Sequence, residues 1–124
     1  MAEREFIVRL EESDDATRRV TIEVPLDLRY FDGHFEGRPM LPGVAQVAAL
    51  ADRHARRLVA GLGPVLRLQR VKFTAVVTPG ERLELTLTEE RRSEEVIVRW
   101  RLERPDMPDE ARLASSGTLV YLAA

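Results

Sequence analysis

One histidine and the start of one helix lie close together in this chain and could act on a carbonyl group. His34 stands between Gly33 and Phe35, and the pair Pro42-Gly43 follows shortly after it, at the head of a long apolar segment. Proline fixes φ and glycine allows the backbone to approach a ligand, so this pair suits the start of a helix. The free N–H groups and the positive dipole end of that helix would point toward His34. A base beside oriented donors is suited to polarising a carbonyl.

The composition is that of one soluble globular domain. The 124 residues are enough to bury one core but not two, and 44% are apolar and 32% charged. The net charge of −2 does not favour nucleic-acid binding. The absence of cysteine excludes disulfides and zinc–thiolate sites. The N-terminal residues form no signal peptide, and no stretch approaches the ~20 apolar residues of a membrane span, so we expect a cytoplasmic protein.

The pattern of apolar residues predicts two strands, one long helix and four further strands. Alternation indicates strands over 6–11, 20–24, 65–77, 83–88, 96–102 and 112–122. Spacings of three and four residues indicate a helix from Gly43 to Ala60, with an apolar face formed by Val44, Val47, Ala48, Ala51, Ala55 and Leu58. One long helix against a strongly curved antiparallel sheet is an α+β arrangement. We expect residues 1–124 to form this single domain.

Two segments carry a resemblance to a known family. The residues 33–46, GHFEGRPMLPGVAQ, resemble the GHFPGxPxxPGVxQ-type active-site segment of hotdog-fold 3-hydroxyacyl-(acyl carrier protein) dehydratases, and are most similar to the aryl-polyene-type branch. The turn 78–81, TPGE, followed by Leu83, is similar to a second family segment. The resemblance implies a hotdog fold and reversible dehydration of 3-hydroxyacyl thioesters to trans-2-enoyl thioesters, in fatty-acid or polyene-type lipid biosynthesis. It implies neither a cofactor nor a metal ion.

The resemblance also implies roles for individual residues. His34 would be the general base or acid at substrate C2 and C3, and the backbone N–H of Gly43 would hold the thioester carbonyl. The expected lining of an acyl tunnel is Phe35, Leu41, Val44 and Val47. The acyl group would be carried by acyl carrier protein or by coenzyme A, with the carrier protein favoured. The family's active site lies between two chains, which implies a homodimer, with a hotdog heterodimer as the other possibility.

The chain departs from the family at the helix carboxylate. Ala48 occupies that position and holds no proton. Asp52 lies one turn further on the same helical face, and Glu36 replaces a proline of the motif near His34. Three donors for the leaving hydroxide therefore stay open: His34 itself, Asp52 through a water molecule, or Glu36. We favour His34 as the essential group with Asp52 assisting it.

Two alternative functions follow from the same departure. One is a hotdog acyl thioesterase, in which Glu36 or Asp52 would activate water. The other is a non-catalytic hotdog subunit that has lost its carboxylate and pairs with an active paralogue.

The remaining candidates are charged or aromatic side chains outside the motif. Arg38, Arg67, Arg70 and Lys72 would receive an acidic carrier protein or a phosphate, the alternative being a solvated strand edge. His54, between arginines, is expected to be solvated, and Trp100 is expected in the core. The segment 65–77 is too apolar for a solvated edge strand, which favours a dimer.

Overall fold

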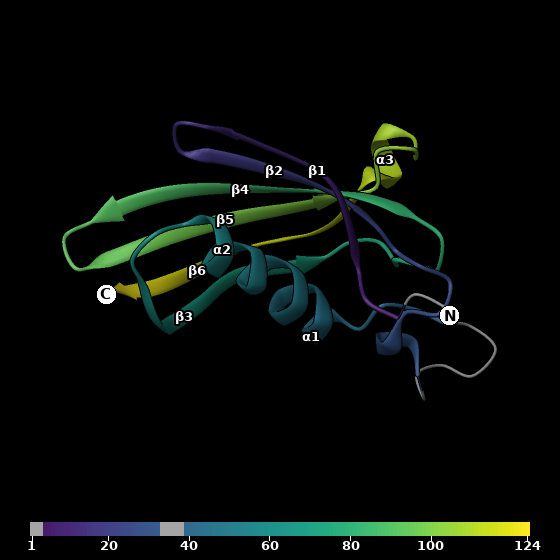
Figure 1. Ribbon diagram of the computed structural model, residues 1–124, viewed down its shortest axis with the longest axis horizontal. Helices are drawn as coiled ribbons and strands as arrows, with labels where there is room; N and C mark the ends of the chain where they lie inside the picture. The colour runs from purple at the N-terminus through teal and green to yellow at the C-terminus, as the bar shows by residue number, and fades with distance from the viewer. Residues whose placement is uncertain (1–3, 33–38) are drawn as a thin grey trace.

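A curved antiparallel sheet wraps around one central helix in the computed structural model, which describes residues 4–32 and 39–124 (Figure 1). The strands are β1 (Ile7–Asp14), β2 (Thr17–Glu23), β3 (Leu62–Phe73), β4 (Arg82–Arg92), β5 (Glu95–Glu103) and β6 (Leu113–Ala123). Their order across the sheet is β1-β2-β4-β5-β6-β3, and every neighbouring pair is antiparallel. The predicted α+β arrangement is confirmed. Two short helical segments outside the central helix are η1 (Arg29–Phe31) and α3 (Asp109–Arg112).

The central helix runs through three consecutive segments: α1 (Gly43–Ala45), the π-helical η2 (Gln46–Asp52) and α2 (Arg53–Leu58). A π-helix bonds each residue to the fifth one along, so it is wound more loosely than an α-helix. The buried positions recur accordingly at four to five residues, as Ala45 and Gln46, then Ala49, Leu50 and Ala51, then His54 and Ala55. The predicted apolar face is therefore wrong at two positions, because Val44 is 74% exposed and Ala48 is also exposed.

The core lies between the helix and the concave face of the sheet. Alternate residues of β2, β4 and β5 point into it, and the helix contributes Leu50, Ala51 and Ala55. Trp100 is 1% exposed and donates its indole N–H to Ser115 Oγ at 3.2 Å. Its ring lies so close to Gly117 that a Cβ there would be 2.3 Å from the ring. The prediction that Trp100 belongs to the core is confirmed.

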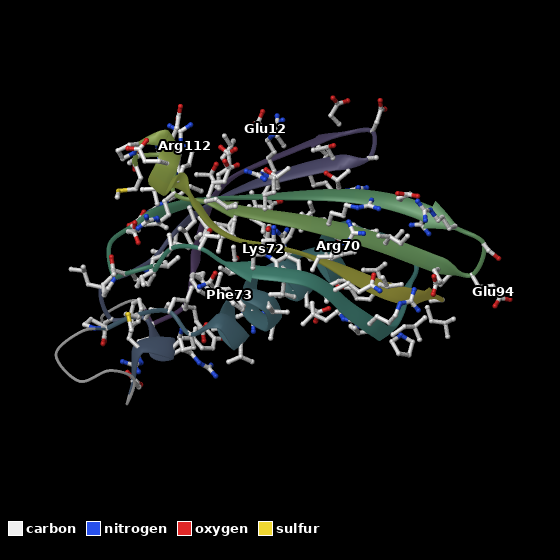
Figure 2. All side chains as sticks on the ribbon, turned by 180° about the vertical axis from the view of Figure 1, so that it is seen from behind. Glu12, Arg70, Lys72, Phe73, Glu94 and Arg112 are labelled. Atoms are coloured by element: carbon white, nitrogen blue, oxygen red, sulfur yellow. The ribbon has the colours of Figure 1, made fainter. Side chains whose placement is uncertain are left out.

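β3 forms one edge of the sheet and carries exposed apolar side chains. Val65, Leu66, Leu68 and Phe73 are between 42% and 51% exposed. Figure 2 shows Arg70, Lys72 and Phe73 following one another along this strand. The strand ends at Phe73, before the predicted boundary at residue 77, and it is bulged where Arg70 adopts a φ of 54°. An apolar edge of this kind is a template for pairing with another chain.

None of the helices in the described part of the chain has the length and apolar character needed to cross a membrane.

Candidate active site

A cavity of about 390 Å³ opens beside the start of the central helix. Its described lining consists of residues 40–43, Gln46 and residues 73–76. The first group leads into the helix, and the second follows the end of β3. The Pro42-Gly43 step and the strand that the sequence singled out for dimerisation therefore meet at one cavity.

The helix begins at this cavity with Gly43, and its first backbone donors are without acceptors among the described residues. The N–H groups of Ala45 and Gln46 bond to the carbonyl oxygen of Pro42, at 3.1 and 3.2 Å. Those of Gly43 and Val44 have no acceptor among the described residues. Pro42 precedes them in an extended conformation, with φ −60° and ψ 147°. Two free donors at the positive end of a helix dipole are suited to a developing oxyanion, which is the role that the sequence predicts for Gly43.

The aromatic ring of Phe73 packs against the backbone of Gly43, where a larger residue would push the ring aside. A Cβ on Gly43 would lie 2.8 Å from Cζ of Phe73, closer than real contacts allow. Phe73 is itself 51% exposed and lines the cavity together with Gly43. The absence of a side chain at Gly43 thus brings strand and helix together at the point where the free donors lie.

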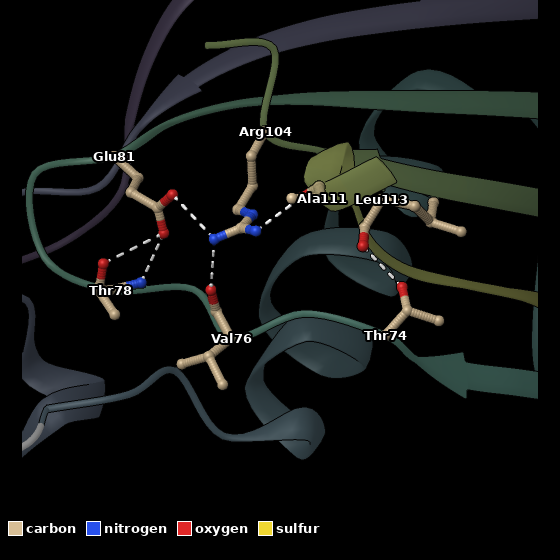
Figure 3. A network of polar contacts seen from close by, with 7 residues as sticks. All are labelled: Thr74, Val76, Thr78, Glu81, Arg104, Ala111 and Leu113. Atoms are coloured by element: carbon tan, nitrogen blue, oxygen red, sulfur yellow. Dashed lines mark hydrogen bonds and ion pairs between the residues drawn. The ribbon is translucent and has the colours of Figure 1, made fainter. Parts of the chain in front are cut away.

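Arg104 and Glu81 hold the segment that forms the far wall of the cavity (Figure 3). The Arg104 guanidinium donates to the carbonyl oxygens of Val76, at 3.0 Å, and Ala111, at 2.5 Å, and lies 3.4 Å from Glu81 Oε1. The Glu81 carboxylate accepts the backbone N–H of Thr78 at 2.7 Å. Both charged side chains are less than a fifth exposed. The family-like turn 78–81 therefore has a structural role here, whereas nothing in the sequence pattern pointed to Arg104.

The predicted site residues divide into three groups. His34, Phe35, Glu36 and Arg38 lie outside the described residues, so the roles predicted for them stay predictions.

Leu41 and Gly43 line the cavity, and the N–H of Leu41 donates to Val77 O at 2.8 Å, which ties the segment before the helix to the wall. Val44 and Val47 are absent from the described lining, since Val44 is exposed and Val47 packs against the core. Their place in an acyl tunnel stays a prediction.

Asp52 lies in a cluster with Tyr121 and Arg56. The Tyr121 hydroxyl donates to Asp52 Oδ1 at 2.7 Å, and Arg56 Nε lies 3.2 Å from the same oxygen. The Arg56 guanidinium also stacks over the Tyr121 ring, 5.1 Å from its centroid. Burial, followed by the bond to Asp52 and its negative charge, raises the pKa of Tyr121, so the phenol keeps its proton and stays a donor. Asp52 is thus held by two side chains away from the described cavity lining, and its assisting role stays a prediction.

His54 is buried, and the expectation of a solvated side chain is wrong. Only 5% of it is exposed, and Arg57 Nη2 lies 2.8 Å from its Nδ1. Burial, then the charge of Arg57 and to a smaller extent that of Arg53, lowers the pKa of His54 to about 4, against an opposing effect of Glu11. The ring is therefore neutral at pH 7 and accepts from Arg57, which also pairs with Glu11. His54 lies three residues after Ala51 and four before Leu58, so the helical spacing is compatible with its inward position, and the expectation of a solvated side chain rested only on its arginine neighbours.

The buried neutral His54 should make the protein less stable in mild acid. Its pKa is about 4 when folded against 6.5 when exposed, so its contribution is present above pH 6.5 and is lost as the pH falls toward 4. That loss amounts to at most about 3 kcal/mol in the free energy of unfolding. Urea unfolding of the wild type and of His54→Gln, at pH 7.5 and pH 4.5, measures it. We expect a smaller loss in the variant, and equal losses would contradict this account of His54.

The four basic side chains predicted to bind the carrier differ in whether an acidic side chain pairs with them. Arg67 pairs with both carboxylate oxygens of Glu95 at 2.9 Å. Arg70 and Lys72 have no acidic partner within the described residues, and both are exposed. The remaining one, Arg38, is among the residues that the structure does not describe. Arg70 and Lys72 are therefore the described members of this set that are available to an anionic partner.

Comparison with known proteins identifies the family. A family model described as ApeI dehydratase matches residues 10–117. The 3-hydroxyacyl-(acyl-carrier-protein) dehydratase FabZ of Streptococcus pyogenes is 35% identical over 126 residues, which cover 90% of this chain and 81% of that protein. Among solved structures, the dehydratase heterocomplex ApeI:P of Xenorhabdus doucetiae has a TM-score of 0.73 at 24% identity and covers 95% of this chain and 97% of that one.

A further solved structure has the same fold over the whole chain. A protein from Erwinia carotovora matches with a TM-score of 0.67 at 28% identity, over 98% of both chains. A hypothetical thioesterase from Streptococcus pneumoniae, solved with coenzyme A, has a TM-score of 0.70 at only 10% identity, over 97% of this chain and 86% of that one, and shows the fold alone. The predicted hotdog fold and the predicted dehydratase resemblance are both confirmed. The chain belongs to the ApeI-like family of hotdog-fold dehydratases.

Proposed function

We propose that this protein catalyses the reversible loss of water from 3-hydroxyacyl thioesters carried on acyl carrier protein, giving trans-2-enoyl thioesters. The observation that carries the proposal is the helix start at Gly43, whose free backbone donors lie at a 390 Å³ cavity directly after the family's histidine segment. The substrate class agrees with the name of the FabZ relative. The pathway would be fatty-acid or polyene-type lipid biosynthesis in the cytoplasm.

The proposed mechanism assigns one role to each end of this site. Histidine side chains in general change charge in the range of neutral pH, so His34 can take the C2 proton there. The charge that develops on the thioester oxygen is stabilised by the N–H of Gly43. The C3–O bond then breaks, and the leaving hydroxide receives a proton and departs as water. That proton comes from His34, with Asp52 assisting through a water molecule.

We also propose that residues 1–124 act as one hotdog domain within a homodimer. The apolar edge strand β3 supplies the pairing surface, since Val65, Leu66 and Leu68 are each more than 40% exposed. The exposed helix residues Val44 and Ala48 add an apolar patch without charge. Because Phe73 belongs both to β3 and to the cavity lining, the dimer edge and the site would be continuous.

The carrier is proposed to approach from the end of β3. Arg70 and Lys72 are exposed and lack acidic partners among the described residues, so they are available to an acidic carrier protein or to the phosphate of its prosthetic arm. Coenzyme A carries the same arm and a terminal phosphate, so it is the second possible carrier.

Calorimetric titration of the purified protein tests the ligand class. The titrants are 3-hydroxyacyl and trans-2-enoyl groups of one chain length on acyl carrier protein, the same groups on coenzyme A, and the carrier protein without an acyl group. We expect saturable binding of both acyl forms, and tighter binding on the carrier protein than on coenzyme A. If neither acyl form binds on either carrier, the proposed function fails.

The second candidate is a subunit that acts only beside a paralogue. Ala48 at the usual carboxylate position favours it, as does the heterocomplex formed by ApeI in the Xenorhabdus structure. Activity that appears only after mixing with a second hotdog chain would support this candidate. A sharp rise in the rate of the isolated protein on Ala48→Glu would indicate instead a specialised dehydratase with a weakened acid.

A further inference from the structure

The outer face of the sheet carries a hollow of about 710 Å³ that shares no described lining residue with the 390 Å³ cavity. Trp100 of β5 is 1% exposed and points into the core, whereas its neighbours Arg99 and Arg101 are exposed. Because side chains alternate along a strand, this outer-face hollow lies on the side of the sheet turned away from the helix. Its size is that of a small-ligand site. Four basic side chains and four hydroxyl groups line it: Arg70, Lys72, Arg99, Arg101, Thr86, Thr88, Ser116 and Thr118.

The charge of the outer-face hollow is positive, and most of it is not neutralised. No carboxylate belongs to its described lining. Arg70 and Lys72 are exposed and have no acidic partner among the described residues, and Arg101 approaches a carboxylate only to 3.8 Å. Of the four, Arg99 has the one short ion pair, with Glu90 at 2.9 Å. Like charges around one hollow repel one another, so a bound anion would relieve that repulsion.

A bulge in β3 lies at the outer-face hollow. Gln69 is opposite Thr118 of β6 and Lys72 is opposite Ser116, so β3 has one residue more than β6 between these two pairs. Arg70 lies within the bulge, with a φ of 54°, and its side chain lines the hollow (Figure 2). The left-handed region is unfavourable for a residue other than glycine, and bulges often re-aim a side chain at a functional site. The bulge therefore points to a use for Arg70 independently of the charge.

Carboxylates on the same face limit the size of the ligand. Glu84, two residues before the lining residue Thr86, lies opposite Glu103 of β5. Glu90, two residues after the lining residue Thr88, lies beyond the other end of this stretch of β4. An extended acidic protein surface would meet these carboxylates and be repelled, whereas a compact anion fits between them. Arginine binds phosphate oxygens in pairs, and hydroxyl groups donate to them as well, so phosphate is the favoured anion.

We propose that the outer-face hollow binds the phosphate groups of a small polyanion, such as a nucleoside diphosphate or the nucleotide part of coenzyme A. Two phosphate groups carry roughly three to four negative charges, which matches the four basic side chains. The inference goes beyond the proposed function and does not rest on it, because the hollow and the cavity are separate. Arg70 and Lys72 are shared with the proposed approach of the carrier, whereas Arg99 and Arg101 belong to the hollow alone.

Calorimetric titration with pyrophosphate, ADP and coenzyme A tests the inference on the wild type and on the double variant Arg99→Gln/Arg101→Gln. Both arginines are exposed, so the exchange leaves the core intact. We expect the wild type to bind each ligand saturably, and less tightly as the salt concentration is raised. The double variant should bind about 10-fold or more weakly, since a hydrogen bond to a charged group is worth about that factor.

The matched control is the double variant Arg53→Gln/Arg82→Gln. It changes the net charge equally, and both residues are exposed and absent from the described lining of the hollow. It should bind all three ligands within twofold of the wild type. Equal weakening in the two double variants would reduce the effect to overall charge and would overturn the inference.

The same titrations distinguish the source of the phosphate groups. Similar affinities for ADP and coenzyme A support a free nucleotide as the ligand, and tighter binding of coenzyme A supports coenzyme A itself. Failure of pyrophosphate, ADP and coenzyme A alike to bind the wild type overturns the inference. So does an acyl carrier protein without its prosthetic arm that binds the wild type and loses binding in Arg99→Gln/Arg101→Gln, since the hollow would then be a docking surface for an acidic protein.

Discussion

His34→Ala should lower the rate of dehydration by about 10²- to 10⁴-fold or more, because a positioned general acid or base is typically worth that factor. On the proposed mechanism His34 takes the C2 proton and is the main source of the proton for the leaving hydroxide, so its loss affects both halves of the reaction. The measurement is kcat/KM for formation of trans-2-enoyl thioester. The melting temperature of the variant is compared with that of the wild type, to separate loss of chemistry from loss of fold.

Asp52→Asn is the matched variant for this prediction. It should reduce activity less than His34→Ala, because Asp52 is engaged by Tyr121 at 2.7 Å and by Arg56 at 3.2 Å and acts only through water. Full dehydratase activity in His34→Ala would show the mechanism to be wrong. A larger loss in Asp52→Asn than in His34→Ala would exchange the roles of the two residues.

Leu68→Asp should convert the proposed dimer into a monomer and abolish most of the activity. Leu68 is 48% exposed on the edge strand β3, and a two-fold axis at this edge would bring two introduced carboxylates together. Light scattering should give the wild type a mass near twice 14.1 kDa and the variant a mass near 14.1 kDa. The dehydratase activity should fall together with the loss of the dimer, because Phe73, at the end of the same strand, lines the cavity.

Leu10→Asp provides the control on the opposite edge. Leu10 is 54% exposed on β1, which lies at the other end of the sheet from β3. The same change there should leave both mass and activity unchanged. A wild-type monomer at micromolar concentration, or a Leu68→Asp variant that stays dimeric, would contradict the proposed assembly.

Most strands were predictable because apolar residues alternate along them, although Val96, Ile97 and Val98 are consecutive and all buried. The apolar positions of 20–24, 83–88 and 96–102 are those that point into the core in β2, β4 and β5. The helix was predictable in position but not in orientation. The α-helical spacing put Val44 and Ala48 on the buried face, whereas both are exposed in a helix whose middle is π-helical. His54 was expected outside because of its arginine neighbours, and it is buried.

The motif indicated where the site lies. Contacts between residues far apart in the sequence could not be predicted from residue spacing. Asp52 and Tyr121 are 69 residues apart, and Arg104 and Glu81 are 23 apart. Neither pair belongs to a local pattern: Asp52 of the helix meets Tyr121 of β6, and Glu81 and Arg104 lie at adjoining ends of the paired strands β4 and β5.

Mass spectrometry of the carrier protein tests the central claim most directly. The purified protein is incubated with a 3-hydroxyacyl group on acyl carrier protein, and the mass attached to the carrier is followed with time, with release of free thiol measured in parallel. The proposed dehydratase gives a carrier that has lost one water molecule and keeps its acyl chain, and it returns water to an enoyl carrier in the reverse direction. A carrier that loses the whole acyl group with release of thiol would contradict the account and indicate a thioesterase. A carrier that stays unchanged until a second hotdog chain is added would also contradict it and indicate a partner subunit.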